Sequence, residues 1–202
     1  MNINGRDITA ADLIEQIDML HSGWCNIMYK HIGQDAYMKL NDTSLLYEGY
    51  EEAVNLNKTW DKINEIDVVF VSPLTRTIQT AINVFKDVDV KLYALDLIKE
   101  YPYNYERINN RKNKTFLQKK YGELIDFSYL QHEEDPYWCE NNKETVHKLK
   151  NRISDTKKFL KKIDEQNIAL VSHSSYIHCF LYDNLDDENV ELKHCHPYHY
   201  GL

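Results

Sequence analysis

The segment Val68-Val-Phe-Val-Ser-Pro-Leu-Thr-Arg-Thr-Ile-Gln-Thr-Ala81 constrains the fold of this chain more than any other part of the sequence. Its four apolar, mostly β-branched residues, Val68–Val71, are typical of a short buried strand. Ser72 and Pro73 then end the strand, because serine is a favoured helix N-cap and proline suits the first helical position. We therefore expect a helix from Pro73 to about Phe85, directly after the carboxyl end of a strand.

Arg76 falls in the first turn of this expected helix. The backbone N–H groups of a helix N-terminus and one guanidinium group together make a good pocket for an anion. An ordinary strand–helix junction with a surface arginine is the simpler interpretation, and the physical argument alone leaves both open.

Apolar runs that are typical of strands alternate along the chain with segments of helical periodicity. The strand-like runs are residues 17–20, 68–71, 91–95, 167–172 and 190–194, and the helical segments are residues 10–16, 50–63, 73–85, 143–163 and those from 174 onward. Such alternation is typical of a parallel sheet with helices on both faces. We therefore predict an α/β fold with three layers (α/β/α) and a mainly parallel central sheet.

With 202 residues, the chain has the length of a single domain, 1–202, with a core of its own. Residues 96–140 are its least periodic part and are rich in tyrosine, asparagine and arginine. Long segments without regular structure in compact domains are usually functional or disordered. The aromatic residues of this segment favour an ordered structure.

The net charge of −8 argues against nonspecific binding to nucleic acid and to anionic membrane surfaces. A phosphate site in such a chain has to be built from local positive charge, because the overall field opposes it. No apolar run is long enough to cross a bilayer, and the polar N-terminus lacks the apolar core of a signal peptide. The four cysteines have no paired spacing, so we expect a reduced, cytoplasmic protein.

The motif Ser72-Pro-Leu-Thr-Arg76-Thr-Ile-Gln-Thr-Ala81 resembles one found in the histidine phosphatase superfamily, also called the phosphoglycerate-mutase-like family. In that family the arginine binds the transferred phosphoryl group. Residues 26–53 are similar to the plant and fungal branch of the superfamily, through the run Asp42-Thr-Ser-Leu-x-x-x-Gly-x-x-Glu-Ala53. The pattern Leu-Val-Ser-His173-Ser-Ser resembles the segment around the family's second catalytic histidine.

The resemblance implies a two-step phosphoryl transfer that needs no metal and no other cofactor. A neutral imidazole of His21 attacks phosphorus, and water then hydrolyses the phosphohistidine. Arg76 and a protonated His173 hold the phosphoryl oxygens. A protonated Glu100 gives its proton to the leaving oxygen and later activates water. Further phosphate contacts are expected from Ser22, Asn26 and Ser174.

The sequence around His21 departs from the family pattern. The superfamily has an arginine directly before the histidine and an asparagine six positions after it, whereas here Leu20 precedes His21 and Asn26 follows it by only five positions. The missing arginine removes a charge-assisted phosphate contact, worth about 1.5–3 kcal/mol. Arg107 is a candidate substitute for that contact.

The same family branch has an insertion equivalent to residues 96–140, with glutamate at the position of Glu100 and arginine at that of Arg107. The resemblance therefore implies that this segment folds over the strand ends as a substrate lid, with Arg107 and Arg111 binding substrate. Taken one at a time, these arginines are more typical of a solvated loop, and His21 is more typical of an ordinary core or surface residue. Only their joint order along the chain indicates a site.

A zinc site is an alternative from another class. Histidine and cysteine cluster near the C-terminus at His194, Cys195, His196 and His199, and Cys139 or Cys179 is available as a further ligand. A flexible histidine-rich tail explains the same cluster more simply. A cysteine phosphatase is excluded, because no cysteine is followed by arginine at the sixth position.

Two further alternatives keep the fold and change the function. Leu20 and the shortened spacing after His21 favour a noncatalytic protein that binds a phosphorylated ligand or partner. A phosphoglycerate-mutase-type phosphotransferase needs a site closed to water, of which the sequence gives no particular sign. The phosphatase remains our first interpretation, with a small phosphorylated metabolite or a phosphoprotein as substrate.

Overall fold

The computed structural model describes residues 2–3, 6–7, 40–102, 107–185 and 192–201 of the chain. Its centre is a parallel sheet of three strands in the order β4-β3-β5. These are β3 (Val68–Val71), β4 (Lys91–Ala94) and β5 (Ile168–Val171). Val71 is level with Ala94 on one side and with Val171 on the other, so the three carboxyl ends meet at one edge of the sheet.

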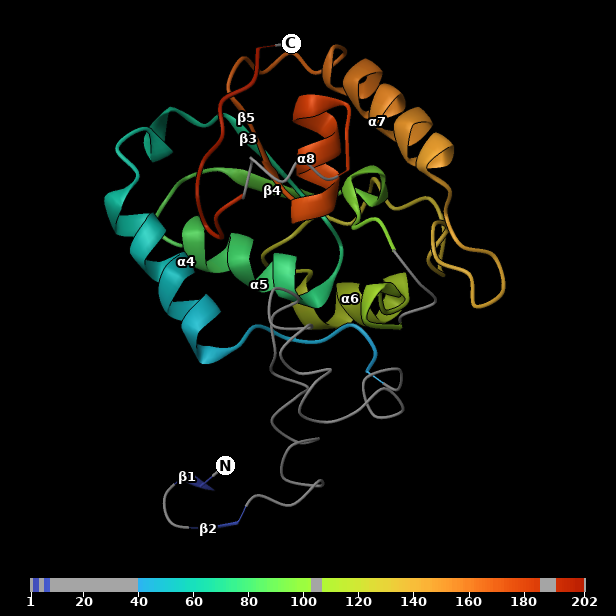
Figure 1. Ribbon diagram of the computed structural model, residues 1–202. Helices are drawn as coiled ribbons and strands as arrows, with labels where there is room; N and C mark the ends of the chain where they lie inside the picture. Colours follow the sequence, from blue (N-terminus) through green and yellow to red (C-terminus); the bar gives the residue numbers. More distant parts are fainter. Residues whose placement is uncertain (1, 4–5, 8–39, 103–106, 186–191, 202) are drawn as a thin grey trace.

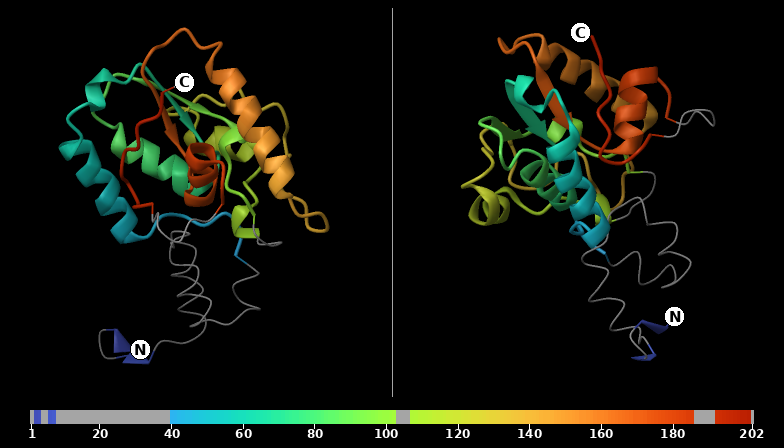
Figure 2. Two further views of the ribbon diagram at one scale, coloured as in Figure 1. Left: turned by 45° about the horizontal axis from the view of Figure 1, so that its top comes forward. Right: turned by 90° about the vertical axis from the view of Figure 1, so that its left-hand side faces the viewer.

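Helices cover both faces of this sheet (Figures 1 and 2). They are α4 (Tyr47–Thr59), α5 (Thr75–Val84), α6 (Lys114–Tyr121), α7 (Val146–Leu160) and α8 (Ser174–Tyr182). Short 3₁₀ helices are η2 (Ile63–Glu65), η3 (Asp96–Ile98) and η4 (Arg107–Asn109). Near the N-terminus, β1 (Asn2–Ile3) pairs antiparallel with β2 (Arg6–Asp7).

The alternation of side chains along β3 divides the core into two parts, because successive residues of a strand point to opposite faces. Val69 and Val71 pack with α4, α5 and α6, whereas Val68 and Phe70 pack with α7 and α8. All four side chains are buried. This is the arrangement expected for a central parallel strand, and it confirms the prediction of a three-layer α/β fold.

The beginning of α5 differs from the sequence-based expectation. The helix starts at Thr75 rather than at Pro73, and the residue in the N-cap position, Leu74, provides no side-chain cap. The carboxylate of Asp42 takes this role from a distant part of the chain: it accepts hydrogen bonds from the backbone N–H and the hydroxyl group of Thr75, at 2.7 and 2.8 Å. Ser72 is not available as a cap, because its side chain points to another partner.

Part of the segment 96–140 belongs to the core. Leu117, Ile125, Phe127 and Leu130 are buried against the α4–α5 side of the sheet. Asp126 also extends the sheet edge through one parallel bridge to β4, with its backbone N–H donating to Leu92 and its carbonyl accepting from Ala94. This part of the segment is therefore anchored beside the sheet, and the function of the segment as a lid stays a prediction.

Two expected strands cannot be compared in full with the structure, because they include residues outside its described part. The strand at residues 17–20 lies outside the described residues. Of the strand expected at 190–194, Leu192 and Lys193 have no strand conformation, and residues 190 and 191 lie outside the description. In the described part of the chain, no helix has the length and apolar character needed to cross a membrane.

Candidate active site

The three strands end together, and the chain places polar residues just beyond each end. Backbone hydrogen bonds continue the ladder past the strands, from the N–H of Ser72 to Val171 and from the N–H of Leu95 to Val71, both at 2.9 Å. The hydroxyl group of Ser172 donates to the carbonyl of Ile98 at 2.6 Å. This edge is where open parallel sheets bind their ligands.

Arg76 lies in the first turn of α5 and is completely buried. Its Nη1 donates to the carbonyl oxygen of Ile108 at 3.1 Å, and its Nη2 donates to Oδ1 of Asn109 at 2.9 Å. Its Nε is buried without a hydrogen-bond partner among the described residues. An unpaired buried donor is costly, so the geometry favours an acceptor that arrives from elsewhere, such as an oxyanion.

Glu100 lies close to Arg76, beyond the end of β4. Its Oε1 accepts a hydrogen bond from the N–H of Tyr101 at 2.8 Å, and its carboxyl group also accepts one from the backbone of Tyr176 in α8. Burial raises the pKa of Glu100 to about 7, while the positive charge of Arg76 and these hydrogen bonds act in the opposite direction. A carboxyl group with such a pKa can donate and accept a proton near neutral pH.

His173 ends the β5 segment and occupies the N-cap position of α8. The ring is buried, and its Nε2 lies 2.7 Å from the hydroxyl oxygen of Ser72 at the end of β3. Ser72 was not among the residues to which the sequence assigned a role in the site. Its position at a strand end, next to another strand end that bears a histidine, is the signal that identifies it.

Asp42 is a second site residue to which the sequence assigned no role. Besides capping α5, its Oδ2 accepts from the backbone N–H of Lys112 at 3.2 Å, and its own N–H donates to the carbonyl of Arg107. Burial raises the pKa of Asp42, and hydrogen bonds from Thr75 oppose that shift. Asp42 thus joins the start of α5, which contains Arg76, to the segment around η4.

The two arginines expected to bind substrate lie in different environments. Arg107 is about half exposed, and its Nη2 pairs with Oε1 of Glu140 at 2.8 Å. Arg111 is buried, with Nε and Nη2 bonded to the two carboxylate oxygens of Asp96 at 2.7 and 3.1 Å. Its remaining contacts are to the backbone carbonyls of Lys112, His132, Glu133 and Glu134. This placement suits a structural role for Arg111 better than contact with a ligand.

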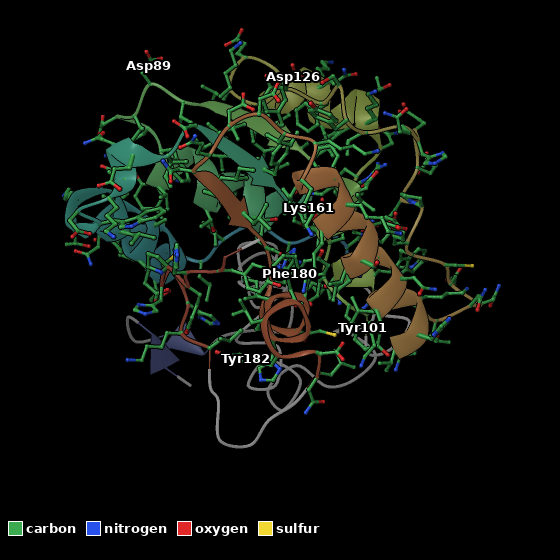
Figure 3. All side chains as sticks on the ribbon, turned by 90° about the horizontal axis from the view of Figure 1, so that it is seen from above. Asp89, Tyr101, Asp126, Lys161, Phe180 and Tyr182 are labelled. Atoms are coloured by element: carbon green, nitrogen blue, oxygen red, sulfur yellow. The ribbon has the colours of Figure 1, made fainter. Side chains whose placement is uncertain are left out.

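Not every candidate residue is described. His21, Ser22 and Asn26 lie outside the described residues, as does Leu20. Ser174 is the first residue of α8 and is exposed. Tyr101, which follows Glu100, and Phe180 of α8 are labelled in Figure 3, and both belong to the core on the α7–α8 side of the sheet.

The C-terminal histidines and cysteine form no metal site in the described part of the chain, where no group of three or more His, Cys, Asp or Glu side chains is arranged to hold a metal ion. Cys195 instead packs against the core on the α4–α5 side of the sheet, and burial raises the pKa of its thiol to about 11. The zinc alternative therefore finds no support in these residues.

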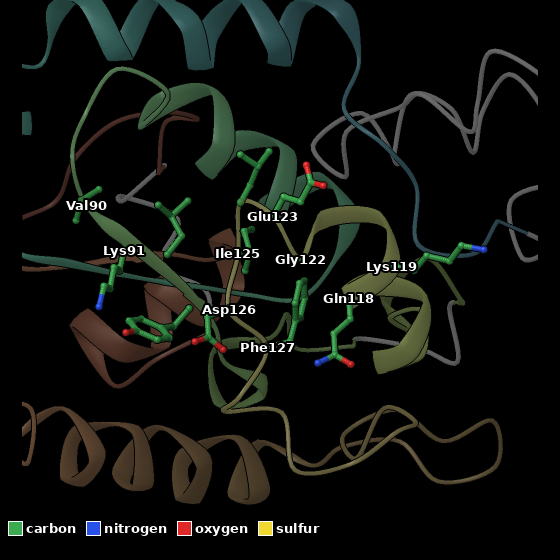
Figure 4. Close-up of a pocket in the computed structure, with 12 residues that line it drawn as sticks. Val90, Lys91, Gln118, Lys119, Gly122, Glu123, Ile125, Asp126 and Phe127 are labelled. Atoms are coloured by element: carbon green, nitrogen blue, oxygen red, sulfur yellow. The ribbon is translucent and has the colours of Figure 1, made fainter.

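An open pocket of about 770 Å³ lies between β4 and α6 (Figure 4). It is lined by Val90 to Tyr93, by Gln118 and Lys119, and by the run from Gly122 to Phe127. Among the described candidates, Arg76, Glu100 and His173 do not line this pocket. The pocket is therefore separate from the buried charged residues at the strand ends.

Known proteins resemble this chain over most of its length. A model of the histidine phosphatase superfamily (branch 1) matches residues 30–200. A phosphoglycerate mutase-like protein of Arabidopsis thaliana is 25% identical over 187 residues, covering 75% of this chain and 68% of that protein.

Among solved structures, an ecdysone phosphate phosphatase from Bombix mori, in complex with tungstate, superposes with a TM-score of 0.50 and 19% identity over 82% of this chain. The match spans 65% of that protein's length. A phosphoserine phosphatase from Entamoeba histolytica, in complex with 3-phosphoglyceric acid, has a TM-score of 0.43 and 22% identity over 71% of this chain and 70% of its own.

Proposed function

Because the chain belongs to the histidine phosphatase superfamily, we propose that it is a phosphatase that hydrolyses a phosphomonoester through a phosphohistidine intermediate, without a metal ion. The observation that supports this most strongly is the proximity of Arg76 and Glu100. A buried guanidinium group, whose Nε has no partner among the described residues, lies near a buried carboxyl group whose pKa is raised to about 7. These are the properties needed in an oxyanion binder and in a general acid that works near neutral pH.

In the proposed reaction, the neutral imidazole of His21 attacks phosphorus as the bond to the leaving oxygen breaks. Glu100 gives its proton to that oxygen, which leaves as an alcohol. Glu100, now ionised, takes a proton from water, and the resulting hydroxide attacks the phosphohistidine and releases inorganic phosphate and free His21. Covalent catalysis of this kind divides one difficult displacement into two easier ones.

Arg76 and a protonated His173 neutralise the charge on the phosphoryl oxygens in both steps. When His173 is protonated, its Nε2–H donates to the hydroxyl oxygen of Ser72, which lies at 2.7 Å. Ser22, Asn26 and Ser174 provide further phosphate contacts in this proposal. Arg76 and His173 supply positive charge locally, as a chain with a net charge of −8 requires.

Arg107 is the proposed substrate-binding arginine, and it compensates in part for Leu20. Its surface pair with Glu140 is easily broken, because exposed ion pairs contribute only about 0–1 kcal/mol. Arg111 has no such role in this proposal, since its guanidinium group is bonded to protein acceptors. The proposed substrate is a small phosphorylated metabolite or a phosphoprotein, and the proposed location is the cytoplasm.

A second candidate function is phosphate binding without turnover, favoured by Leu20 and by the short spacing from His21 to Asn26. Such a protein keeps Arg76 and His173 as ligand contacts and has no productive nucleophile. A mutase-type phosphotransfer is the third candidate. It differs from the phosphatase only in the acceptor of the phosphoryl group.

Hydrolysis of an aryl phosphate by the purified protein, at mildly acidic pH and with a metal chelator present, tests the proposal. We expect activity that resists the chelator, is lost in His21→Ala and His173→Ala, and is retained in His147→Ala, a control at an exposed position of α7. Radioactive label from a ³²P-labelled phosphomonoester should remain on the denatured wild-type protein and be absent from His21→Ala.

Activity that disappears with the chelator contradicts the metal-independent mechanism. A folded wild-type protein that binds inorganic phosphate without hydrolysing any phosphomonoester supports the noncatalytic alternative. Transfer of the label to a second sugar acid, instead of to water, supports the mutase.

A further inference from the structure

The guanidinium group of Arg76 is held by two consecutive residues of η4. Ile108 contributes its backbone carbonyl and Asn109 its side-chain oxygen, one to each terminal nitrogen of the guanidinium group. Nε is then the nitrogen without a protein partner among the described residues. Since a guanidinium group is planar and rigid, fixing Nη1 and Nη2 also fixes the direction of Nε–H.

Asn109 is itself held by a second contact, through its main chain. Its backbone carbonyl accepts a hydrogen bond from Nζ of Lys99 at 2.9 Å, and Lys99 forms an ion pair with Asp135. Lys99 is 1% exposed and Asn109 7% exposed, so neither contact is weakened by bulk water. Buried hydrogen-bonded charges of this kind hold a fixed geometry, because breaking one contact leaves an unpaired charge in the interior.

Asp135, the ion-pair partner of Lys99, accepts three further hydrogen bonds from the backbone. Its Oδ2 accepts the backbone N–H of Arg111 at 3.0 Å, and its Oδ1 accepts those of Tyr137 and Trp138 at 2.9 and 3.1 Å. Three separate stretches of the segment 96–140 are thereby tied together, at Lys99, at η4 and at Asp135. Lys99 directly precedes Glu100, so the proposed general acid is attached to the same assembly.

We propose that Asn109 is a positioning residue for Arg76, and that the buried Lys99–Asp135 pair positions Asn109 in turn. The oxygen of the Asn109 side chain keeps Nη2 occupied, so that the buried Nε–H of Arg76 stays directed at the incoming phosphoryl group. Without this acceptor, the guanidinium group turns toward the nearby carboxyl group of Glu100 and its affinity for an anion falls. This inference rests on the proposed phosphatase function and adds a residue to it.

The direct readout is the ¹H–¹⁵N NMR signal of the Arg76 Nε–H group, assigned by its loss in Arg76→Lys. In the wild-type protein we expect a signal protected from exchange with water, because the group is buried, and a shift when inorganic phosphate is added. In Asn109→Ala the signal should broaden or exchange with water before any phosphate is added. Asn110→Ala is the matched control, since Asn110 is the neighbouring residue of the same type and no hydrogen bond joins it to Arg76 in the described part of the chain.

Asn109→Asp separates the hydrogen-bond acceptor from its charge. The carboxylate still accepts from Nη2, so the protected Nε–H signal should be retained, whereas the added negative charge should weaken binding of inorganic phosphate. For hydrolysis of an aryl phosphate, Asn109→Ala should lower kcat/KM about tenfold, the effect of about 1.4 kcal/mol of lost interaction. Thermal unfolding shows which variants are folded.

An unchanged Nε–H signal in folded Asn109→Ala overturns the positioning role. If Asn109→Ala does not fold, Asn109→Asp decides, and loss of the protected signal in that folded variant overturns the role as well. A wild-type signal that does not respond to inorganic phosphate counts against the proposed function instead, because the positioning of Arg76 is read before phosphate is present.

Discussion

Ser72 and His173 lie 101 positions apart in the sequence, and the hydroxyl oxygen of one is 2.7 Å from Nε2 of the other. They meet because β3 and β5 are parallel neighbours that end at the same level. Ser72 and His173 are both buried. The contact therefore fixes the orientation of the imidazole ring in a place where water offers no substitute partner.

Ser72→Ala removes this contact. We expect kcat to fall about tenfold or more, because an imidazole that is no longer oriented stabilises the phosphoryl oxygens less well, and about 1.4 kcal/mol corresponds to tenfold. Loss of this buried hydrogen bond should also lower the free energy of unfolding by about 1–3 kcal/mol. Thr156→Val is the matched control, as it removes another buried hydroxyl contact, to Tyr176, outside the proposed reaction. Equal kcat values for Ser72→Ala and the control contradict a role for Ser72 in orienting His173.

Glu100 gives the reaction a predictable pH dependence. Because burial raises its pKa to about 7, the protonated acid is available below that pH, and kcat/KM should fall as the pH rises through about 7. Glu100→Gln cannot donate a proton, so it should lose most of the activity toward alkyl phosphates. Activity should be partly retained toward aryl phosphates with good leaving groups, since these need little protonation. Equal losses for both kinds of ester indicate that Glu100 is not the proton donor.

The same carboxyl group makes stability depend on pH. Its pKa is about 7 in the folded protein and near the ordinary value of 4.5 in the unfolded chain. Between these values the folded state binds the extra proton, so the free energy of unfolding should fall as the pH rises from 4.5 to 7, by up to about 3 kcal/mol. Glu100→Gln should remove this part of the slope and be more stable than the wild type at pH 8. Urea unfolding of both proteins across this pH range measures the difference, and parallel curves speak against the raised pKa.

Variants of Arg107 and Glu140 test the proposed substrate contact separately from any effect on the stability of the fold. Their side chains are 49% and 61% exposed, so Arg107→Ala should change the free energy of unfolding by less than about 1 kcal/mol. If Arg107 contacts the substrate, KM should nevertheless rise severalfold with little change in kcat, as expected for lost binding in ground and transition state alike. Glu140→Gln releases Arg107 without removing it and should leave KM unchanged or lower. A rise of KM in Glu140→Gln as large as in Arg107→Ala indicates that the ion pair, and not the free arginine, is what matters.

The local sequence predicted the central strands and most helices, because the hydrophobic patterns that indicate them lie within a few neighbouring residues. The run Val68–Val71 and the apolar runs that became β4 and β5 have the length and composition of buried strands. The helical spacing around Ala53 and Leu149 gave α4 and α7, although α4 begins three residues earlier than expected and α7 is shorter. Helix ends were predicted less well, since the cap of α5 comes from Asp42, 33 positions away in the sequence.

By itself, the sequence determined the α/β class, the parallel direction of the strands and the family, because each depends on local periodicity or on a contiguous motif such as the one from Ser72 to Ala81. Only the tertiary structure decided what surrounds each polar group. It brought three pairs of side chains that are distant along the chain into hydrogen-bond contact. These pairs are Ser72 and His173, Asn109 and Arg76, and Asp96 and Arg111. It also raised the pKa of Glu100 by burial. The physical reason is that burial and electrostatic environment come from the packing of many segments at once, and no local pattern encodes them.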